Sequence, residues 1–189
     1  MESSYKYMTG FEFPVSHQQL IDCVPGVTPP RGCETEMDYE ALVNYTVKTA
    51  RIIQSVDTYP NFNYSMDKCY QNPQFGGIRF SNFIEEESQD PDQIKYFIYS
   101  KGPLLAYVKV GMEFMLYQSG IMDVANTGFI KYHPVLLVGY KDDPLGGYWI
   151  VKNSWGTSWG ENGYIKIRIA PKGSIDVLEI QSSHFAYFR

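Results

Sequence analysis

Three runs rich in Val, Ile, Tyr and Trp, at 134–140, 147–152 and 164–169, constrain the fold of this chain more than any other feature. Residues of these types favour β-strands. Turn residues separate the runs, with Asp142-Asp143-Pro144 before the second and Gly160-Glu161-Asn162-Gly163 before the third. Because short connections join antiparallel neighbours, the sequence predicts an antiparallel sheet in the back half of the chain.

The front half has the pattern of helices and loops. The elements expected ahead of the three runs are the end of a helix at 1–10, a short helix opened by Ser16, a helix at 36–49, a helix opened by Asp90-Pro91-Asp92, a strand at 104–110 and a helical turn at 114–117. A helical front and a β-rich back predict an α+β fold.

Charge and hydropathy narrow the classes of partner. The net charge is −5 and there is no basic run, which argues against nucleic acid or an anionic membrane surface. No apolar stretch is long enough to span a bilayer, and Met1-Glu2-Ser3-Ser4-Tyr5 has neither the charged nor the apolar region of a signal peptide. Taken literally, the chain stays in the cytosol; taken as a fragment, it leaves the compartment open.

His133 and Asn153 are the candidate catalytic residues. His133 opens one of the predicted strands, and Asn153 follows the next. Adjacent antiparallel strands bring these positions to one sheet edge, where the Asn oxygen can accept from one imidazole N–H and leave the other nitrogen facing a nucleophile. Trp155 can cover that hydrogen bond. The alternative is that His133 is a structural histidine at a strand end.

A longer pattern favours the catalytic interpretation. The blocks that carry it are His133-Pro134-Val135-Leu136-Leu137-Val138-Gly139-Tyr140, Tyr148-Trp149-Ile150-Val151-Lys152-Asn153-Ser154-Trp155-Gly156 and Trp159-Gly160-Glu161-Asn162-Gly163-Tyr164. They resemble the His and Asn blocks of papain-like cysteine peptidases. Pro134 departs from that family, which usually has Ala or Gly there.

The resemblance implies a papain-like, two-lobed α+β fold, with a truncated helical lobe at 1–80 and an antiparallel β-barrel-like lobe at 81–189, and it allows the C-terminal residues to cross back towards the front lobe. It implies peptide-bond hydrolysis without a metal or organic cofactor, with His133 and Asn153 as catalytic residues and Trp155 and Trp159 shielding them. Tyr132 and Pro134 are then expected beside the cleft. A secretory or lysosomal compartment is typical of the family.

The front half resembles the family as well, in Val15-Ser16-His17-Gln18-Gln19-Leu20-Ile21-Asp22-Cys23 and in Gly32-Cys33. In that alignment the nucleophilic Cys falls ahead of Met1 and is absent from these residues. The resemblance pairs Cys23 with Cys69 in a disulfide and leaves Cys33 unpaired, which accounts for the odd number of cysteines, three.

Cys33 is not expected to replace the missing nucleophile. Glu34 and Glu36 stand close to it in the sequence, and negative neighbours raise the pKa of a thiol. Glu36 also stands where the family has a glycine in the cleft, so its side chain would crowd and charge the place where a peptide backbone approaches.

Three functions stay open at this point. The chain is a papain-like peptidase domain that is inactive alone because it lacks the nucleophile; or it is part of an active endopeptidase whose Cys segment lies upstream or on a second polypeptide, tethered through Cys33; or it is a pseudopeptidase that binds peptides or inhibitors without cleaving them. The partners expected are a peptide or protein substrate once the site is completed, and the second chain.

Overall fold

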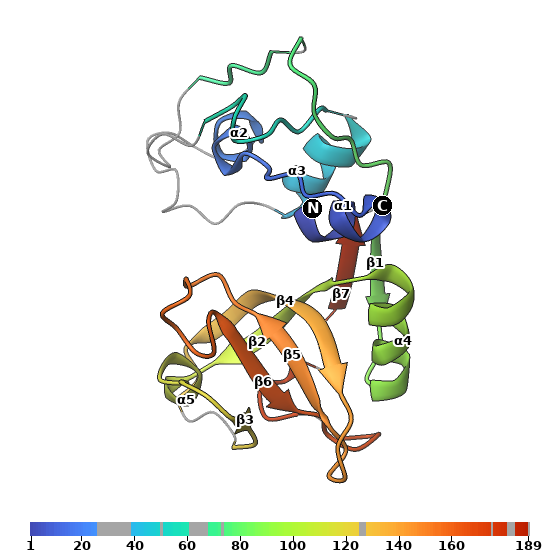
Figure 1. Ribbon diagram of the computed structural model, residues 1–189, viewed down its shortest axis with the longest axis vertical. Coiled ribbons are helices and arrows are strands. Elements are labelled where there is room, and N and C mark those ends of the chain that lie inside the picture. Colours follow the sequence, from blue (N-terminus) through green and yellow to red (C-terminus); the bar gives the residue numbers. More distant parts are fainter. Residues whose placement is uncertain are drawn as a thin grey trace. The chain divides into compact units, whose positions relative to one another are not determined.

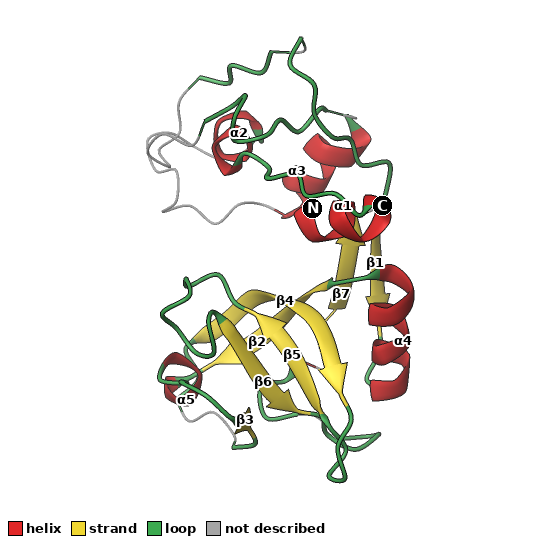
Figure 2. Cartoon of the chain, in the orientation of Figure 1, coloured by secondary structure: helices red, strands yellow, loops and turns green. Residues whose placement is uncertain are grey.

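The computed structural model describes residues 1–25, 39–49, 51–60, 68–72, 74–124, 128–174, 176–180 and 184–188. The chain divides into two compact units, Met1–Phe83 with Phe188–Arg189 and Ile84–Tyr187. Figure 2 shows helices and loops in the first unit and most of the strands in the second.

The first unit is built from short helices. They are α1 Glu2–Thr9, α2 His17–Cys23, α3 Tyr39–Val43 and the π-helix η2 Asn44–Lys48. The helix α1 ends at Gly10, whose φ of 77° is readily available only to glycine. Ser16 caps α2, where its hydroxyl accepts from the backbone N–H of Gln19 at 3.1 Å. Both boundaries are those that the sequence predicts.

A small apolar core and a buried polar side chain stabilise this unit. The core residues are Val15, Val24, Tyr45, Ile53, Ile78 and Phe80. Gln19 is fully buried, and its amide donates to the Ile52 carbonyl at 2.8 Å while its oxygen accepts from the Gln54 backbone at 2.7 Å. The Gln19 side chain thus satisfies backbone groups of the segment at 52–54, which belongs to no helix or strand.

A disulfide joins Cys23, at the end of α2, to Cys69 across 46 residues of sequence. Next to it, the Tyr59 hydroxyl donates to the buried carboxylate of Asp22 at 2.7 Å. Gln18 donates to the other oxygen of the same carboxylate at 2.9 Å. The disulfide and the Tyr59 contact fix α2 to the loop segments around it, and the Gln18 contact orients the carboxylate within the helix.

The second unit holds an open sheet with two helices (Figure 1). The strands are β1 Phe83–Glu87, β2 Leu104–Val110, β3 Ile121–Met122, β4 Lys131–Lys141, β5 Tyr148–Lys152, β6 Tyr164–Arg168 and β7 His184–Phe188; the helices are α4 Pro91–Lys101 and α5 Met112–Met115. The sheet order is β1-β7-β2-β4-β5-β6-β3. Among the described residues, no helix is long and apolar enough to cross a membrane.

The described strands of the predicted barrel-like lobe form an open sheet and do not close into a barrel. A barrel requires its first and last strands to pair with each other. Here the last strand, β3, has only two residues and pairs in parallel with β6, and β1 forms the opposite edge. The predicted α+β papain-like fold is confirmed, with an open sheet in place of a closed barrel.

Burial alternates along the central strands. In β2 every second residue, from Leu104 to Val110, is buried, and β6 alternates in the same way. The inward side chains meet Ile94 and Phe97 of α4 and the fully buried Trp149 of β5. This core gives a rigid platform on which the ends of β4 and β5 present the candidate catalytic residues.

Candidate active site

His133 and Asn153 lie side by side at one edge of the platform. His133 is the third residue of β4, lies opposite Val108 of β2 and is 9% exposed. Asn153 follows β5 directly, beyond Lys152, which pairs with Leu136 of β4. The distance from His133 Nε2 to Asn153 Oδ1 is 2.9 Å.

The hydrogen bond defines the tautomer of the imidazole. An amide oxygen only accepts, so the proton of this bond is on Nε2 of His133. The backbone N–H of Ser154 donates to the same Asn153 oxygen at 2.7 Å, which fixes the amide orientation. In the neutral ring Nδ1 therefore carries the lone pair, and it is the nitrogen able to take a proton from a nucleophile.

Burial keeps the imidazole neutral. The pKa of His133 is lowered from its ordinary value, chiefly because burial disfavours the charged ring, while the bond to Asn153 opposes the shift and the charge of Lys131 adds to it. A histidine with a lowered pKa is unprotonated near neutral pH, which is the state a general base needs.

Aromatic rings cover the hydrogen bond. The ring centroid of Trp155 lies 5.1 Å from that of His133, and Trp159 lies 5.5 Å from Trp155 in an edge arrangement. Trp155 is 37% exposed, so its outer face meets solvent while its inner face meets the imidazole. The indole N–H of Trp159 donates to the Met115 carbonyl at 3.3 Å and ties the cover to α5.

Phe114 is the site residue that the sequence analysis did not identify. It is fully buried, and its ring lies 6.3 Å from His133, 5.3 Å from Trp155 and 5.0 Å from Trp159. The buried Phe114 ring therefore packs against the rings of His133, Trp155 and Trp159 and holds them in place. The available signal was an aromatic residue in the turn that directly follows β2, the strand paired with the His133 strand.

A hollow of about 460 Å³ adjoins the aromatic cover. Trp159, Met115 and Leu116 line it, with Tyr117 and Ser158. The wall is mixed: Leu116 and Met115 contribute apolar groups, and Gln118 and Ser158 contribute polar ones.

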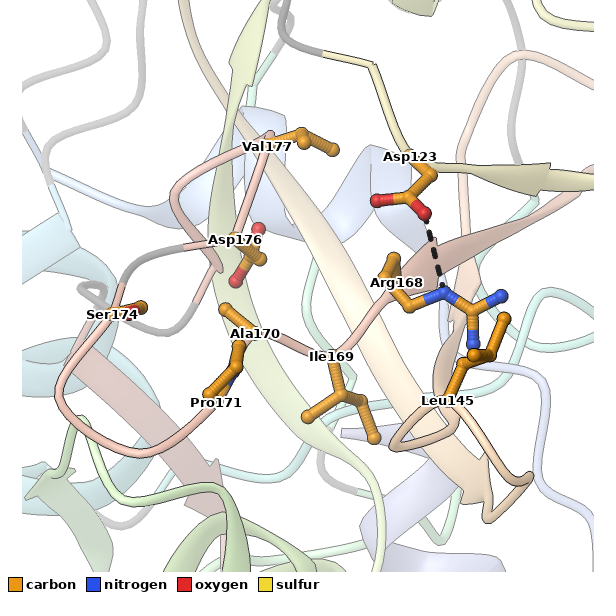
Figure 3. A pocket seen from close by; sticks show the side chains of 9 residues that line it. All are labelled: Asp123, Leu145, Arg168, Ile169, Ala170, Pro171, Ser174, Asp176 and Val177. Atoms are coloured by element: carbon orange, nitrogen blue, oxygen red, sulfur yellow. Dashed lines mark ion pairs between the residues drawn. The ribbon is translucent and has the colours of Figure 1, made fainter.

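A second hollow, of about 370 Å³, lies at the other end of the sheet (Figure 3). Arg168 ends β6 and lies opposite Tyr148 at the start of β5, whereas Asn153 follows the end of β5. Arg168 pairs with Asp123 at 3.5 Å and with Asp143 at 2.7 Å. This hollow contains neither of the candidate catalytic residues, and its basic side chain is already paired.

The remaining predicted positions fall in different places. Tyr132 and Pro134 flank His133 on β4 with exposed side chains. Cys23 and Cys69 form their disulfide in the first unit. Glu36 and Cys33 lie outside the described residues. Within the described part of the chain, no three His, Cys, Asp or Glu side chains are placed to hold a metal ion.

Several known proteins are similar to this chain in sequence. The chain is 32% identical over 171 residues to a cathepsin L-like proteinase of Fasciola hepatica, which covers 88% of this chain and 50% of that protein. It is 33% identical over 174 residues to cathepsin S of Rattus norvegicus, again covering 88% of this chain and 50% of that protein. The chain thus spans about half the length of the relatives it matches.

Solved structures share the fold. The bromelain protease of Ananas comosus, in complex with the E64 inhibitor, superposes with a TM-score of 0.77 at 27% identity and covers 99% of this chain and 83% of that one. Digestive procathepsin L2 proteinase of Tenebrio molitor gives 0.77 at 26% identity, over 98% of this chain and 56% of that one. The sequence profile described as papain family cysteine protease matches residues 1–186. The chain therefore belongs to the papain family of cysteine proteases.

Proposed function

We propose that this chain supplies the general base of a cysteine-peptidase site, with His133 as the base and Asn153 as its orienting amide. The observation that carries the proposal is the 2.9 Å contact between His133 Nε2 and Asn153 Oδ1. With the Nε2–H of His133 donated to the Asn153 oxygen, Nδ1 takes the proton of a thiol as the thiolate attacks a peptide carbonyl, and the imidazolium then protonates the leaving amine.

The attacking thiol is, in this proposal, not among the 189 residues. Cys23 and Cys69 are joined to each other, which removes two of the three cysteines from consideration as the nucleophile. Cys33 has acidic neighbours in the sequence, and these disfavour the thiolate. The chain alone is therefore expected to be inert, and peptide hydrolysis needs a Cys-bearing segment from an upstream stretch or from a second polypeptide linked through Cys33.

A peptidase assay on two preparations tests this. When the 189 residues are produced alone, they should show no His133-dependent hydrolysis of a fluorogenic peptide. The protein isolated from its natural source should hydrolyse the peptide, and mass spectrometry should find a Cys-bearing segment continuous with the chain or disulfide-linked to Cys33. In a reconstituted protein carrying that segment, His133→Ala should lower kcat by several powers of ten.

His17→Ala is the matched control, because His17 is an exposed histidine of α2 outside the site. It should leave the rate unchanged. Hydrolysis by the 189 residues alone that is lost in His133→Ala would show that the nucleophile is present and would overturn that part of the proposal. A natural protein that binds peptides and never cleaves them would instead identify a pseudopeptidase.

A further inference from the structure

Glu179 adopts a left-handed backbone conformation, with φ of 60°, although it is not glycine. Such a conformation crowds Cβ against the backbone, and strain of this kind is often found near functional sites. The segment around it is firmly anchored. Leu178 and Ile180 are fully buried, and their backbone N–H groups both donate to the Asp176 carboxylate, at 3.0 and 3.1 Å. The anchored segment presents the Glu179 side chain in one direction.

That side chain bridges β2 and β4, the strand that carries His133. Lys109 Nζ donates to one carboxylate oxygen of Glu179 at 2.8 Å, and the Tyr132 hydroxyl donates to the other at 2.8 Å. Lys109 on β2 and Tyr132 on β4 are direct cross-strand partners. The backbone N–H of Lys109 also donates to the Leu178 carbonyl at 2.8 Å. We call Lys109, Tyr132 and Glu179 the Glu179 clasp.

The clasp acts on the strand end that bears His133. Strand β4 begins at Lys131, so Tyr132 and His133 are its second and third residues. The ends of strands open more readily than their centres, and a displaced ring would lose its alignment with the Asn153 oxygen. The ring centroid of Phe129 lies 5.2 Å from that of Tyr132, and this contact also stabilises the start of β4.

We propose that Glu179 is a positioning residue that acts through Tyr132. It holds the start of β4 so that His133 Nε2 stays hydrogen-bonded to the Asn153 oxygen. The inference rests on the proposed function, in which His133 is the base. Because Lys109 balances the carboxylate charge, Glu179 acts through the geometry of β4 rather than by adding net negative charge. A glycine at this position would relieve the backbone strain but could make neither of these two contacts.

The test is the exchange rate of the His133 Nε2–H proton with water, measured by NMR on the 189-residue chain without peptide. Tyr132→Phe removes one oxygen and no charge, and Glu179→Gln keeps the shape of the acid. Both should raise the exchange rate about five-fold or more, because the strand end opens more often. Asp142→Asn is the matched control. It breaks the 2.7 Å pair between Lys95 and Asp142, just beyond the opposite end of β4, and should leave the exchange rate unchanged.

Unchanged exchange in both clasp variants would overturn the inference, and so would an increase confined to Glu179→Gln, since the effect would then not pass through Tyr132. An equal increase in Asp142→Asn would show a general loss of stability and would overturn it too. The readout needs no nucleophile. A failed peptidase assay with responsive exchange therefore refutes only the proposed function, and the reverse result refutes only the role of Glu179.

Discussion

At the residue scale, the environment of His133 combines two opposing influences on its protonation. Burial lowers the pKa of the imidazole, and the Asn153 oxygen raises it by accepting the Nε2 proton. Burial is the larger cause, so the ring is neutral near neutral pH and the Asn153 amide serves mainly to fix its tautomer and orientation.

Replacing Asn153 should shift the titration of His133 in a defined order. In Asn153→Ala the acceptor is lost, so the pKa of His133 should fall below that of the unaltered chain. In Asn153→Asp a carboxylate faces the ring and favours its charged form, so the pKa should rise above it. Following the imidazole carbon shifts with pH by NMR gives the three midpoints. A midpoint in Asn153→Ala equal to or above that of the unaltered chain would contradict the role of the amide.

The sequence predicts the pair His133 and Asn153 because both stand at the ends of strands with a clear apolar pattern. It also predicts Trp155 and Trp159 through the resemblance. Phe114 is not predicted, because its contact with His133 depends on how α5 folds back against the sheet, and an aromatic residue in the turn after β2 does not by itself specify that tertiary contact. Glu179 is not predicted either, because its contacts with Lys109 and Tyr132 join residues that are far apart in the sequence.

At the element scale, local rules decide most of the boundaries. Asp90 caps α4 by accepting from the Asp92 backbone at 3.0 Å, and Gly102 ends it, so Pro91–Lys101 agrees with the sequence pattern. The predicted strand 104–110 is β2 as observed. The helical turn expected at 114–117 begins earlier, at Met112. Strong caps and regular alternation therefore give reliable elements.

The elements that the sequence did not predict lack such signals. Strand β1 carries three consecutive glutamates, which give no apolar alternation. Strand β3 has only two residues, and its pairing with β6 is parallel. Strand β7 pairs with β2 far from it in sequence, through Leu105 and Ala186. Their pairing depends on which sheet edges are available, and no short-range sequence pattern specifies that.

Removing the cap of α2 should destabilise the first unit. Ser16 is fully buried, and its hydroxyl accepts from the Gln19 backbone, so Ser16→Ala leaves a buried donor without its partner. The expected loss is about 1 kcal/mol of the opening free energy of the first unit, measured by hydrogen exchange at the Ile53 amide. Ser119→Ala, at an exposed serine that caps no helix, should change it by less than about 0.5 kcal/mol. Equal losses in the two variants would contradict the capping role.

At the scale of the whole molecule, the two units have separate apolar cores. Among the described residues, the apolar core cluster of the first unit, which includes Ile53 and Phe80, is much the smaller, whereas that of the second includes Trp149 and most of the central sheet. Small cores give little stability by themselves, so covalent links carry more of it. The first unit holds the disulfide between Cys23 and Cys69.

Removing that disulfide should therefore weaken the first unit. For a loop of 46 residues, the chain-entropy estimate of the loss is about 4 kcal/mol. Because a chain with two units need not unfold in one step, hydrogen exchange resolved by residue is the appropriate measurement. In Cys23→Ser with Cys69→Ser, amide protection should fall at Ile53 and Ile78, which pair in the first core, well before it falls at Val151 in the sheet.

Cys33→Ser separates the loss of a disulfide from the loss of a sulfur atom, since it removes a cysteine and leaves the Cys23–Cys69 bond in place. Protection at Ile53 should then stay close to that of the unaltered chain. If Cys33→Ser lowered protection as far as the double variant, the stabilising effect would not come from closing the loop. If the double variant lost protection at Val151 and Ile53 together, the disulfide would act on the molecule as one cooperative unit, which contradicts a role confined to the smaller core.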